Sequence, residues 1–284
     1  MSTLSDLTRI FTVAKTLDSR ALNLAGAQPF RALIARGLYD VRPKSHDPLT
    51  VELARTGIVV CENFLLSDAF EDLTREVDEY MGANVNSTVI QDGADEIRRY
   101  SLGKVDPTRF PQLAQWRSNP VNALVSGAER RSVGRNFDGG ALIEHVTVGV
   151  NEEKANPQDN THLHIDTFFN THKVWLYLDD VDAENGAFVF VPGSHLLDRV
   201  RLWHEYLEST GENRRSRRIG DDELKERGLQ QRVVECRRNT LVVANTCGYH
   251  SRSIGKPGTS RRALHKEFRF NPFSLALGSQ RKAG

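Results

Sequence analysis

The sequence predicts a mainly β protein of the sandwich, jelly-roll or barrel type with flanking helices, and two observations lead to this class. Short segments rich in β-branched and aromatic residues follow one another in the second half of the chain, at 143–151, 161–169, 174–181, 188–191, 240–244 and 263–270. Turn-forming residues separate them, and Asn185-Gly186 between two of the segments is a strong hairpin signal. Short strands in series, rather than strands that alternate with helices, are typical of these all-β folds.

The composition fits a globular protein without a strong overall charge. The 284 residues are 39% hydrophobic, which is sufficient for a full core. The 38 Lys and Arg residues nearly cancel the 37 Asp and Glu residues, so no overall field attracts nucleic acid or an anionic membrane. We therefore expect neither as a partner.

Further features of the sequence bear on the location of the protein. No apolar run is long enough to span a membrane, and charged residues interrupt the apolar ones near the N-terminus, so we expect no signal peptide. The three cysteines, Cys61, Cys236 and Cys247, lack the spacing of a metal site and suit a reducing compartment. These features predict a cytoplasmic protein and leave open whether it is a monomer or a homodimer.

The start of the chain is predicted to be helical. Apolar residues recur there at three- and four-residue spacing, first at Leu7, Ile10, Phe11, Ala14 and Leu17 and then at Phe30, Leu33, Ile34 and Leu38. Pro43 and Pro48 end this region. We expect residues 1–45 to form a helical extension packed on the core, and residues 46–284 to form a single domain.

The predicted domain opens with a strand at 57–64 and a helix that Ser67 and Asp68 can cap and Gly82 closes. Residues 83–140 are polar, and we expect loops there with short helices near 110–116 and 120–128.

Residues 198–238 interrupt the predicted strands with a charged, Arg-rich stretch that includes Arg214, Arg215, Arg217 and Arg218. Such a stretch is either a solvated helical face or a lid that meets an anionic group of a substrate. The sequence leaves both interpretations open.

The segment 161–169 carries side chains that can bind a metal. In a strand, residues two apart point to the same face, so His164 and Asp166 can converge on one cation. His162 would share that face, so this segment alone leaves open which histidine is the ligand. Two residues of ordinary type at this spacing also arise by chance, and a second observation is required.

A distant histidine and an arginine supply that observation. Two histidines and one carboxylate around a metal with open positions are typical of non-haem Fe(II) oxygenases. His250 follows a strongly apolar predicted strand and a Gly-containing turn, and Arg261 begins another predicted strand eleven residues later. A guanidinium can hold a dicarboxylate with two hydrogen bonds, which a lysine ammonium cannot do. A carboxylate-bearing cosubstrate beside an iron needs such an anchor.

At this point the sequence resembles the phytanoyl-CoA dioxygenase family of Fe(II)- and 2-oxoglutarate-dependent oxygenases, from about Gly57 to Pro272. The resemblance rests on five pieces in the expected order: the predicted strand and helix of 57–81, His164-x-Asp166, the run 175–195 with its Glu-Asn-Gly and Pro-Gly-Ser-His elements, His250, and Arg261. It implies a double-stranded β-helix of the jelly-roll or cupin type, behind an N-terminal helical extension.

The resemblance also implies the roles of these residues. His164, Asp166 and His250 would bind Fe(II) and act as the catalytic centre, and Arg261 would anchor 2-oxoglutarate. Arg262 competes for the anchoring role. Strand alternation places it with Leu264, Phe268 and Phe270, an outward-packing set, whereas Arg261 shares its face with Ala263, His265 and Glu267, which suits a barrel interior. We therefore assign the anchor to Arg261.

Other residues are weaker candidates for the cosubstrate site. Thr147 and Asn151 lie on one face of the predicted strand 143–151 and could donate to the other end of the cosubstrate, although ordinary strand hydrogen bonding explains them equally well. Trp175 could form a wall of the site or belong to the core. We expect His195 to close its turn, and we assign His145, His162 and His172 to packing or polar strand positions.

The resemblance implies that O2 is a further cosubstrate and that 2-oxoglutarate is converted to succinate and CO2 while an unactivated C–H bond is oxidised. Hydroxylation is the default outcome. Halogenating relatives lack the carboxylate ligand, and Asp166 argues against that reaction.

The alternatives are a non-catalytic jelly-roll binding protein and a zinc hydrolase that uses His162-x-His164. The expected substrate is a small molecule or natural-product intermediate. The Arg-rich stretch favours an anionic one.

Overall fold

Most of the predicted strands come together in one antiparallel sheet. The computed structural model describes residues 11–83, 87–92, 95–103, 105–118, 121–130, 140–150, 161–211 and 218–275. The sheet has seven strands in the order β1-β8-β5-β10-β4-β3-β2. Their bounds are β1 Ile58–Cys61, β2 Ser87–Asp92, β3 Asp95–Ser101, β4 Gly140–Val150, β5 Thr171–Tyr177, β8 Thr240–Asn245 and β10 Ser260–Phe270.

A second, smaller sheet faces it. This sheet has the order β7-β6-β9, with β6 at Phe188–Phe190, β7 at Arg232–Val234 and β9 at His250–Arg252. A buried cluster that includes Tyr177, Phe188, Phe190 and Ala263 fills the space between the sheets. Two antiparallel sheets around a shared interior form the predicted jelly-roll core, so the fold class is confirmed.

Helices cover the outer face of the large sheet. Helix α5 (Ser67–Gly82) and helices α6 (Pro111–Ser118) and α7 (Val121–Glu129) contribute to one core cluster with the outward residues of the strands. Leu264 and Phe268 of β10 belong to this outer cluster, whereas Ala263 belongs to the inner one. The predicted assignment of the two faces of this strand is therefore correct.

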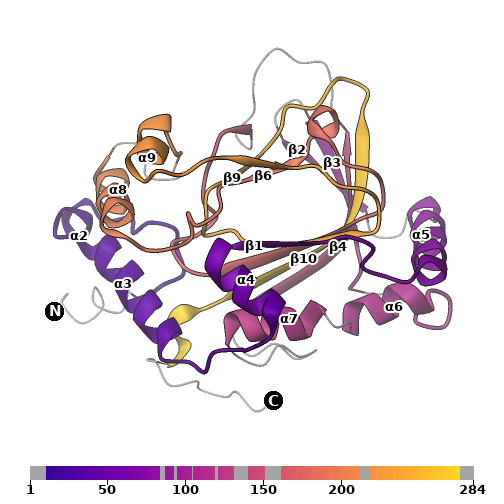
Figure 1. Cartoon of the computed structure of the whole chain (residues 1–284), viewed down its shortest axis with the longest axis horizontal. Helices are drawn as coiled ribbons and strands as arrows, with labels where there is room; N and C mark the ends of the chain where they lie inside the picture. The colour runs from indigo at the N-terminus through magenta and orange to yellow at the C-terminus, as the bar shows by residue number, and fades with distance from the viewer. Residues whose placement is uncertain are drawn as a thin grey trace.

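The N-terminal region packs at the other end of the molecule. Figure 1 shows α2 (Arg20–Leu24) and α3 (Ala27–Asp40) beside α8 (Arg199–Thr210), opposite α5 and α6. The first predicted helical segment is wrong where the structure describes it, because residues 11–19 are irregular. Arg31 of α3 is fully buried and donates to the carbonyl oxygens of Thr12 and Ala14, which ties that segment to α3.

The structure corrects several further predictions. Helix α4 (Pro48–Thr56) precedes β1, and no element was predicted for residues 49–56. Asp47 caps this helix, since its carboxylate accepts from the Thr50 backbone. The strands β2 and β3 pair as a hairpin inside the region predicted as loops. The short helices predicted there are confirmed as α6 and α7.

The hairpin predicted at Asn185-Gly186 is also wrong. Residues Ala183–Asn185 form a short 3₁₀ turn that Asp182 caps, and the chain crosses there from β5 in the large sheet to β6 in the small one. The segment 161–169 is not a regular strand either, and only His164 makes bridge pairs, with His250 and Arg218.

The charged region 198–238 contains regular structure. It includes helix α8 (Arg199–Thr210), helix α9 (Asp221–Glu226) and strand β7 of the small sheet. Arg214, Arg215 and Arg217 lie outside the described residues. Among the helices that the structure describes, none is both long and apolar enough to cross a lipid bilayer.

Candidate metal centre

His164, Asp166 and His250 come together at the edge of the small sheet. His250 begins β9, and His164 extends the sheet by pairing with it through two backbone hydrogen bonds of 2.9 and 3.0 Å. The Asp166 backbone amide donates to the Thr246 carbonyl at 3.0 Å, which fixes the next turn of this segment. One ligand atom from each of the three side chains lies within 4.8 Å of the others.

The two imidazoles are held in one orientation by backbone carbonyls. Nδ1 of His164 is 2.9 Å from the His162 carbonyl oxygen, and Nδ1 of His250 is 3.0 Å from that of Gly248. A carbonyl oxygen can only accept, so Nδ1 of each ring carries the proton and donates. The Nε2 atom of each ring then has a lone pair for a cation.

Burial keeps both rings neutral. Burial is the largest cause that lowers the pKa of His250, to about 3, and it also lowers the pKa of His164. Both imidazoles are therefore unprotonated at neutral pH, which is the state that binds a metal.

The third side chain, Asp166, is ionised. Burial opposes this by raising its pKa, but the neighbouring Lys173 ammonium outweighs burial, and the pKa lies well below its usual range. The Lys173 ammonium on β5 is 2.7 Å from Oδ2 of Asp166, and Nε2 of His250 is 3.7 Å from the same oxygen. Two neutral imidazoles and one carboxylate on one side of a shared point fit the facial arrangement of a non-haem Fe(II) site.

Arg261 and Arg262 point to opposite faces of β10. Arg262 lies on the outer face, where it forms ion pairs with Asp179 at 2.7 Å and with Asp78 of α5. Arg261 lies on the inner face with Ala263, and its Nη1 donates to the Asn185 carbonyl at 2.7 Å. The guanidinium also contacts Tyr177. This tyrosine is fully buried, and burial raises the pKa of its hydroxyl to about 12. Arg261 is thus held at the interior by the turn before β6.

Aromatic rings connect this arginine region to the histidines. Trp175 lies two residues before Tyr177 on the inner face, and its ring centroid is 4.7 Å from that of Phe188 and 5.3 Å from that of His265. The Phe188 ring in turn lies 5.8 Å from the His250 ring. Trp175 is half-buried against a largely buried cluster.

The other candidates lie in different positions. Thr147 pairs with Ala263 in the backbone register, in line with the inner face, but its side chain lies outside what the structure describes. Asn151 lies outside the described residues altogether, and so does the side chain of His145. The His162 side chain is exposed.

His172 and His195 have structural contacts. His172 contacts Glu129 of α7, both of them buried. His195 donates from Nε2 to the Ala54 carbonyl at 3.0 Å, which ties its turn to α4.

Sequence reasoning missed Lys173, Tyr177 and Arg252. The sequence held a signal for the first two. Side chains alternate along a strand, so Lys173 and Tyr177 point to the same face as Trp175.

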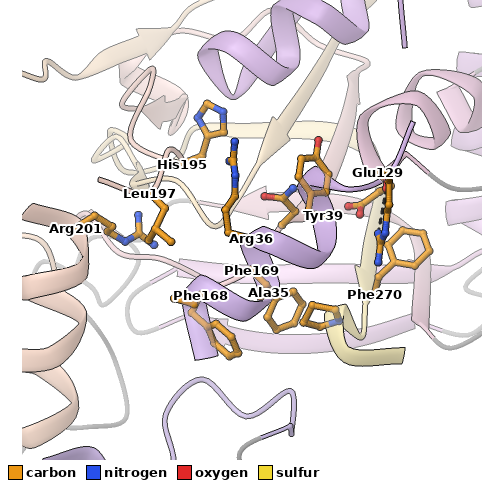
Figure 2. A pocket seen from close by; sticks show the side chains of 14 residues that line it. Ala35, Arg36, Tyr39, Glu129, Phe168, Phe169, His195, Leu197, Arg201 and Phe270 are labelled. Atoms are coloured by element: carbon orange, nitrogen blue, oxygen red, sulfur yellow. Dashed lines mark hydrogen bonds between the residues drawn. The ribbon is translucent and has the colours of Figure 1, made fainter. Parts of the chain in front are cut away.

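A pocket lined partly by α3 is separate from this centre. It lies between α3, the Phe168–Asn170 segment and the chain near His195, and none of the three clustered residues lines it (Figure 2). Its volume of about 40 Å³ has room for on the order of three water molecules. We therefore do not assign the substrate to it.

The fold and this centre together define a class of protein, the non-haem iron enzymes with a jelly-roll core. The chain belongs to the phytanoyl-CoA dioxygenase (PhyH) family, whose sequence profile matches residues 53–237. It is therefore a 2-oxoglutarate-dependent non-haem iron enzyme, with iron and 2-oxoglutarate as its cofactors. No curated protein sequence matches the chain.

Solved structures share the fold. One is the epimerase SnoN in complex with Fe3+, alpha ketoglutarate and nogalamycin RO, with 19% identity, a TM-score of 0.54, and coverage of 78% of this chain and 82% of that one. Another is the carbocyclase SnoK from nogalamycin biosynthesis, with 16% identity, a TM-score of 0.50, and coverage of 80% and 84%. At these identities the similarity shows the common fold alone.

Proposed function

We propose that this enzyme oxidises an unactivated C–H bond of a small molecule, with hydroxylation as the outcome, and that His164, Asp166 and His250 bind its iron. The observation that carries the proposal is the convergence of the three ligand atoms within 4.8 Å, while Arg261 faces the same interior. When bound, the iron supplies the oxidising chemistry by which O2 and 2-oxoglutarate give succinate, CO2 and an oxidised substrate.

The residues of the chain would prepare this chemistry by holding the ligand atoms in place. Backbone carbonyls orient both imidazoles, and Lys173 fixes the Asp166 carboxylate from β5. Such outer contacts set both the orientation and the basicity of metal ligands. Three ligands on one side would leave room on the other side for the cosubstrates.

Arg261 would anchor 2-oxoglutarate with its guanidinium. Its contact with the Asn185 carbonyl holds the side chain at the interior. A guanidinium can meet a carboxylate in a two-pronged geometry. Thr147 and Asn151 would donate to the other end of the cosubstrate. Trp175 would cover one side and exclude water.

The substrate we propose is a small, anionic natural-product intermediate. Arg99 on β3 supports a negatively charged substrate. Its neighbour Tyr100 packs in the outer core, so Arg99 faces inward. Its Nε is buried and makes no hydrogen bond within the described part of the chain. A buried donor without a partner is costly, and an anionic group would satisfy it. One neighbour by fold, SnoN, was solved with nogalamycin RO bound.

The experiment has two parts. Anaerobically purified protein is analysed for bound metal, and succinate formation from 2-oxoglutarate is measured with a panel of acidic and neutral metabolites. We expect iron, slow uncoupled succinate formation, and faster formation with an acidic substrate. The matched control is Asp166→Ala, which should lose both metal and turnover. A wild-type protein that binds no 2-oxoglutarate would refute the proposal.

The product of the reaction is determined by mass spectrometry. A gain of one oxygen atom marks hydroxylation. An unchanged substrate mass, or a loss of two hydrogen atoms, would instead indicate epimerisation or ring closure, and the neighbours SnoN and SnoK are called an epimerase and a carbocyclase.

Neither alternative function gains support from the structure. A zinc hydrolase that uses His162-x-His164 would need the His162 side chain at the metal, but this side chain is exposed, and its carbonyl is what contacts His164. A non-catalytic binding protein would need no ionised carboxylate between two buried imidazoles, since such a cluster is costly unless a cation occupies it.

A further inference from the structure

Two arginine side chains from opposite sheets meet at Gly186. A Cβ atom placed on Gly186 would be 2.4 Å from Nη1 of Arg261 and 3.4 Å from Cδ of Arg252. Both atoms are thus close to one point, and the distance between them cannot exceed about 6 Å. The glycine has a positive φ of 84°, so it supplies both the turn and the space for the two side chains.

Arg252 reaches this point from the metal side. It lies two residues after His250 on β9, so the two side chains share a face, and their Cα atoms are about 7 Å apart. Arg252 pairs in register with Phe188, whose ring is in the inner cluster and close to the His250 ring. Only 8% of Arg252 is exposed.

We propose that Arg252 and Arg261 form one two-arginine site for the carboxylate of 2-oxoglutarate that is not bound to iron. The inference rests on the proposed function and extends it, because neither the family match nor the reasoning from sequence assigns a role to Arg252. Arg261 holds this carboxylate from β10 in the large sheet, and Arg252 holds it from β9 in the small sheet.

The charges of the two side chains explain why an anion belongs there. Arg252 and Arg261 both carry a positive charge, and their side chains lie close together at Gly186, with Arg252 buried and Arg261 half-buried. Their charges repel each other more strongly there than they would in water. A carboxylate between them removes this cost and accepts hydrogen bonds from both. The site therefore favours a cosubstrate with a second carboxylate over a 2-oxo acid without one.

The span of the site fits such a cosubstrate. His250 and Arg252 are two residues apart on their strand, and the distance that this spans is similar to the length of a short carbon chain. A five-carbon dicarboxylate can thus place its 2-oxo end at the metal ligands and its other end at the arginines.

The test measures binding rather than turnover. Wild-type protein and the variants Arg252→Gln, Arg252→Lys and Arg261→Gln are loaded with Fe(II) without oxygen and titrated calorimetrically with 2-oxoglutarate and with 2-oxobutyrate, which has no second carboxylate. We expect Arg252→Gln to weaken 2-oxoglutarate binding by about tenfold or more and to leave 2-oxobutyrate binding unchanged. Arg252→Lys should lie between the two.

Controls separate this inference from the proposed function. Arg262→Gln, on the outer face of the same strand, should leave both affinities unchanged, and thermal unfolding of each variant verifies the fold. If Arg252→Gln binds 2-oxoglutarate as the wild type does, or loses both oxo acids equally, the two-arginine site is wrong while the proposed function stands. If the wild type itself binds no 2-oxoglutarate, both are wrong.

Discussion

The carboxylate of Asp166 depends on one side chain from β5. Lys173 on β5 holds it at 2.7 Å, and both side chains are largely buried. We predict that Lys173→Met lowers Fe(II) affinity by about 10–100-fold, because the carboxylate loses the contact that orients it. Lys173→Arg should restore part of the affinity. Anaerobic titration with Fe(II) measures this, and equal affinity in Lys173→Met would show that the ion pair plays no part in metal binding.

The ligand set gives a second prediction at this scale. Asp166→Ala, His164→Ala and His250→Ala should each lose iron and C–H oxidation, because each removes one of the three converging ligand atoms. His162→Ala should retain both, since the His162 carbonyl, which the substitution keeps, is the part that contacts His164. Metal analysis of the purified variants checks this. Iron loss in His162→Ala with iron kept in His164→Ala would reverse the assignment.

Much of this centre could be predicted from residue types and order, and the reason lies in local geometry. His164 and Asp166 are close in sequence, and the inward face of Arg261 follows from strand alternation. Alternation places Lys173 on the face of Trp175, but it does not show that this face meets Asp166, and it gives no role to Arg252. Both roles depend on which strand faces which loop across two sheets, and alternation within one strand carries no such information.

At the scale of single elements, the turn that ends in His195 connects the small sheet to α4. Nε2 of His195 donates to the Ala54 carbonyl, and the Cβ of a residue at 57 would be 2.6 Å from Nδ1, so only glycine fits beneath the ring. Burial lowers the pKa of His195 to about 4 from the model-peptide value of 6.5. The folded state thus holds this ring in its neutral form.

This shift predicts how stability depends on pH. Between about pH 6.5 and 4 the unfolded chain takes up a proton at His195 that the folded chain does not, so stability falls as the pH falls through this range. The loss from this residue amounts to at most about 3 kcal/mol. His195→Asn keeps a side-chain donor and removes the titration, so its urea unfolding free energy should change less between pH 7 and 5 than that of the wild type. An equal change would show that another group controls the acid sensitivity.

A helix or strand could be predicted where one periodic pattern of apolar residues was sufficient to define it. It could not be predicted where tertiary contacts determine the local structure. The helix α5 and the strand β8 follow directly from their apolar spacing. Asn185-Gly186 has the composition of a hairpin turn, but its neighbours β5 and β6 belong to different sheets, and the Asp182 cap turns it into a 3₁₀ crossover. The hairpin of β2 and β3 was missed because its residues are polar, and pairing with β4 is what stabilises it.

At the scale of the whole molecule, helix α8 joins the N-terminal extension to the metal centre. Glu205 of α8 accepts from Gln28 of α3 at 3.3 Å. Arg201 of α8 is buried and donates to the carbonyls of Ser194 and Cys247, each at 2.9 Å, and Cys247 lies in the turn before His250. These contacts make α8 a fixed support rather than a moving part.

The residues after α8 are attached differently. Arg218 makes a bridge pair with His164, and the Ile219 amide donates to the Leu163 carbonyl at 2.9 Å. Ile219 and Leu224 complete a small apolar cluster with Leu163, Ile165 and Tyr249, beside two of the proposed metal ligands. A small cluster can open at a lower free energy than the main core.

We therefore predict that only the second part of the charged region responds to substrate. Amide hydrogen exchange across 218–226 should slow when a substrate found in the metabolite panel is added to the anaerobic Fe(II)·2-oxoglutarate enzyme, because the substrate closes this segment over His164. Exchange in α8 should not change, which makes 199–210 the internal control. Arg218→Glu should weaken substrate binding but leave uncoupled succinate formation nearly intact, since the bridge to His164 is made by the backbone. If exchange across 218–226 stays the same at saturation, the segment is a solvated face and not a lid.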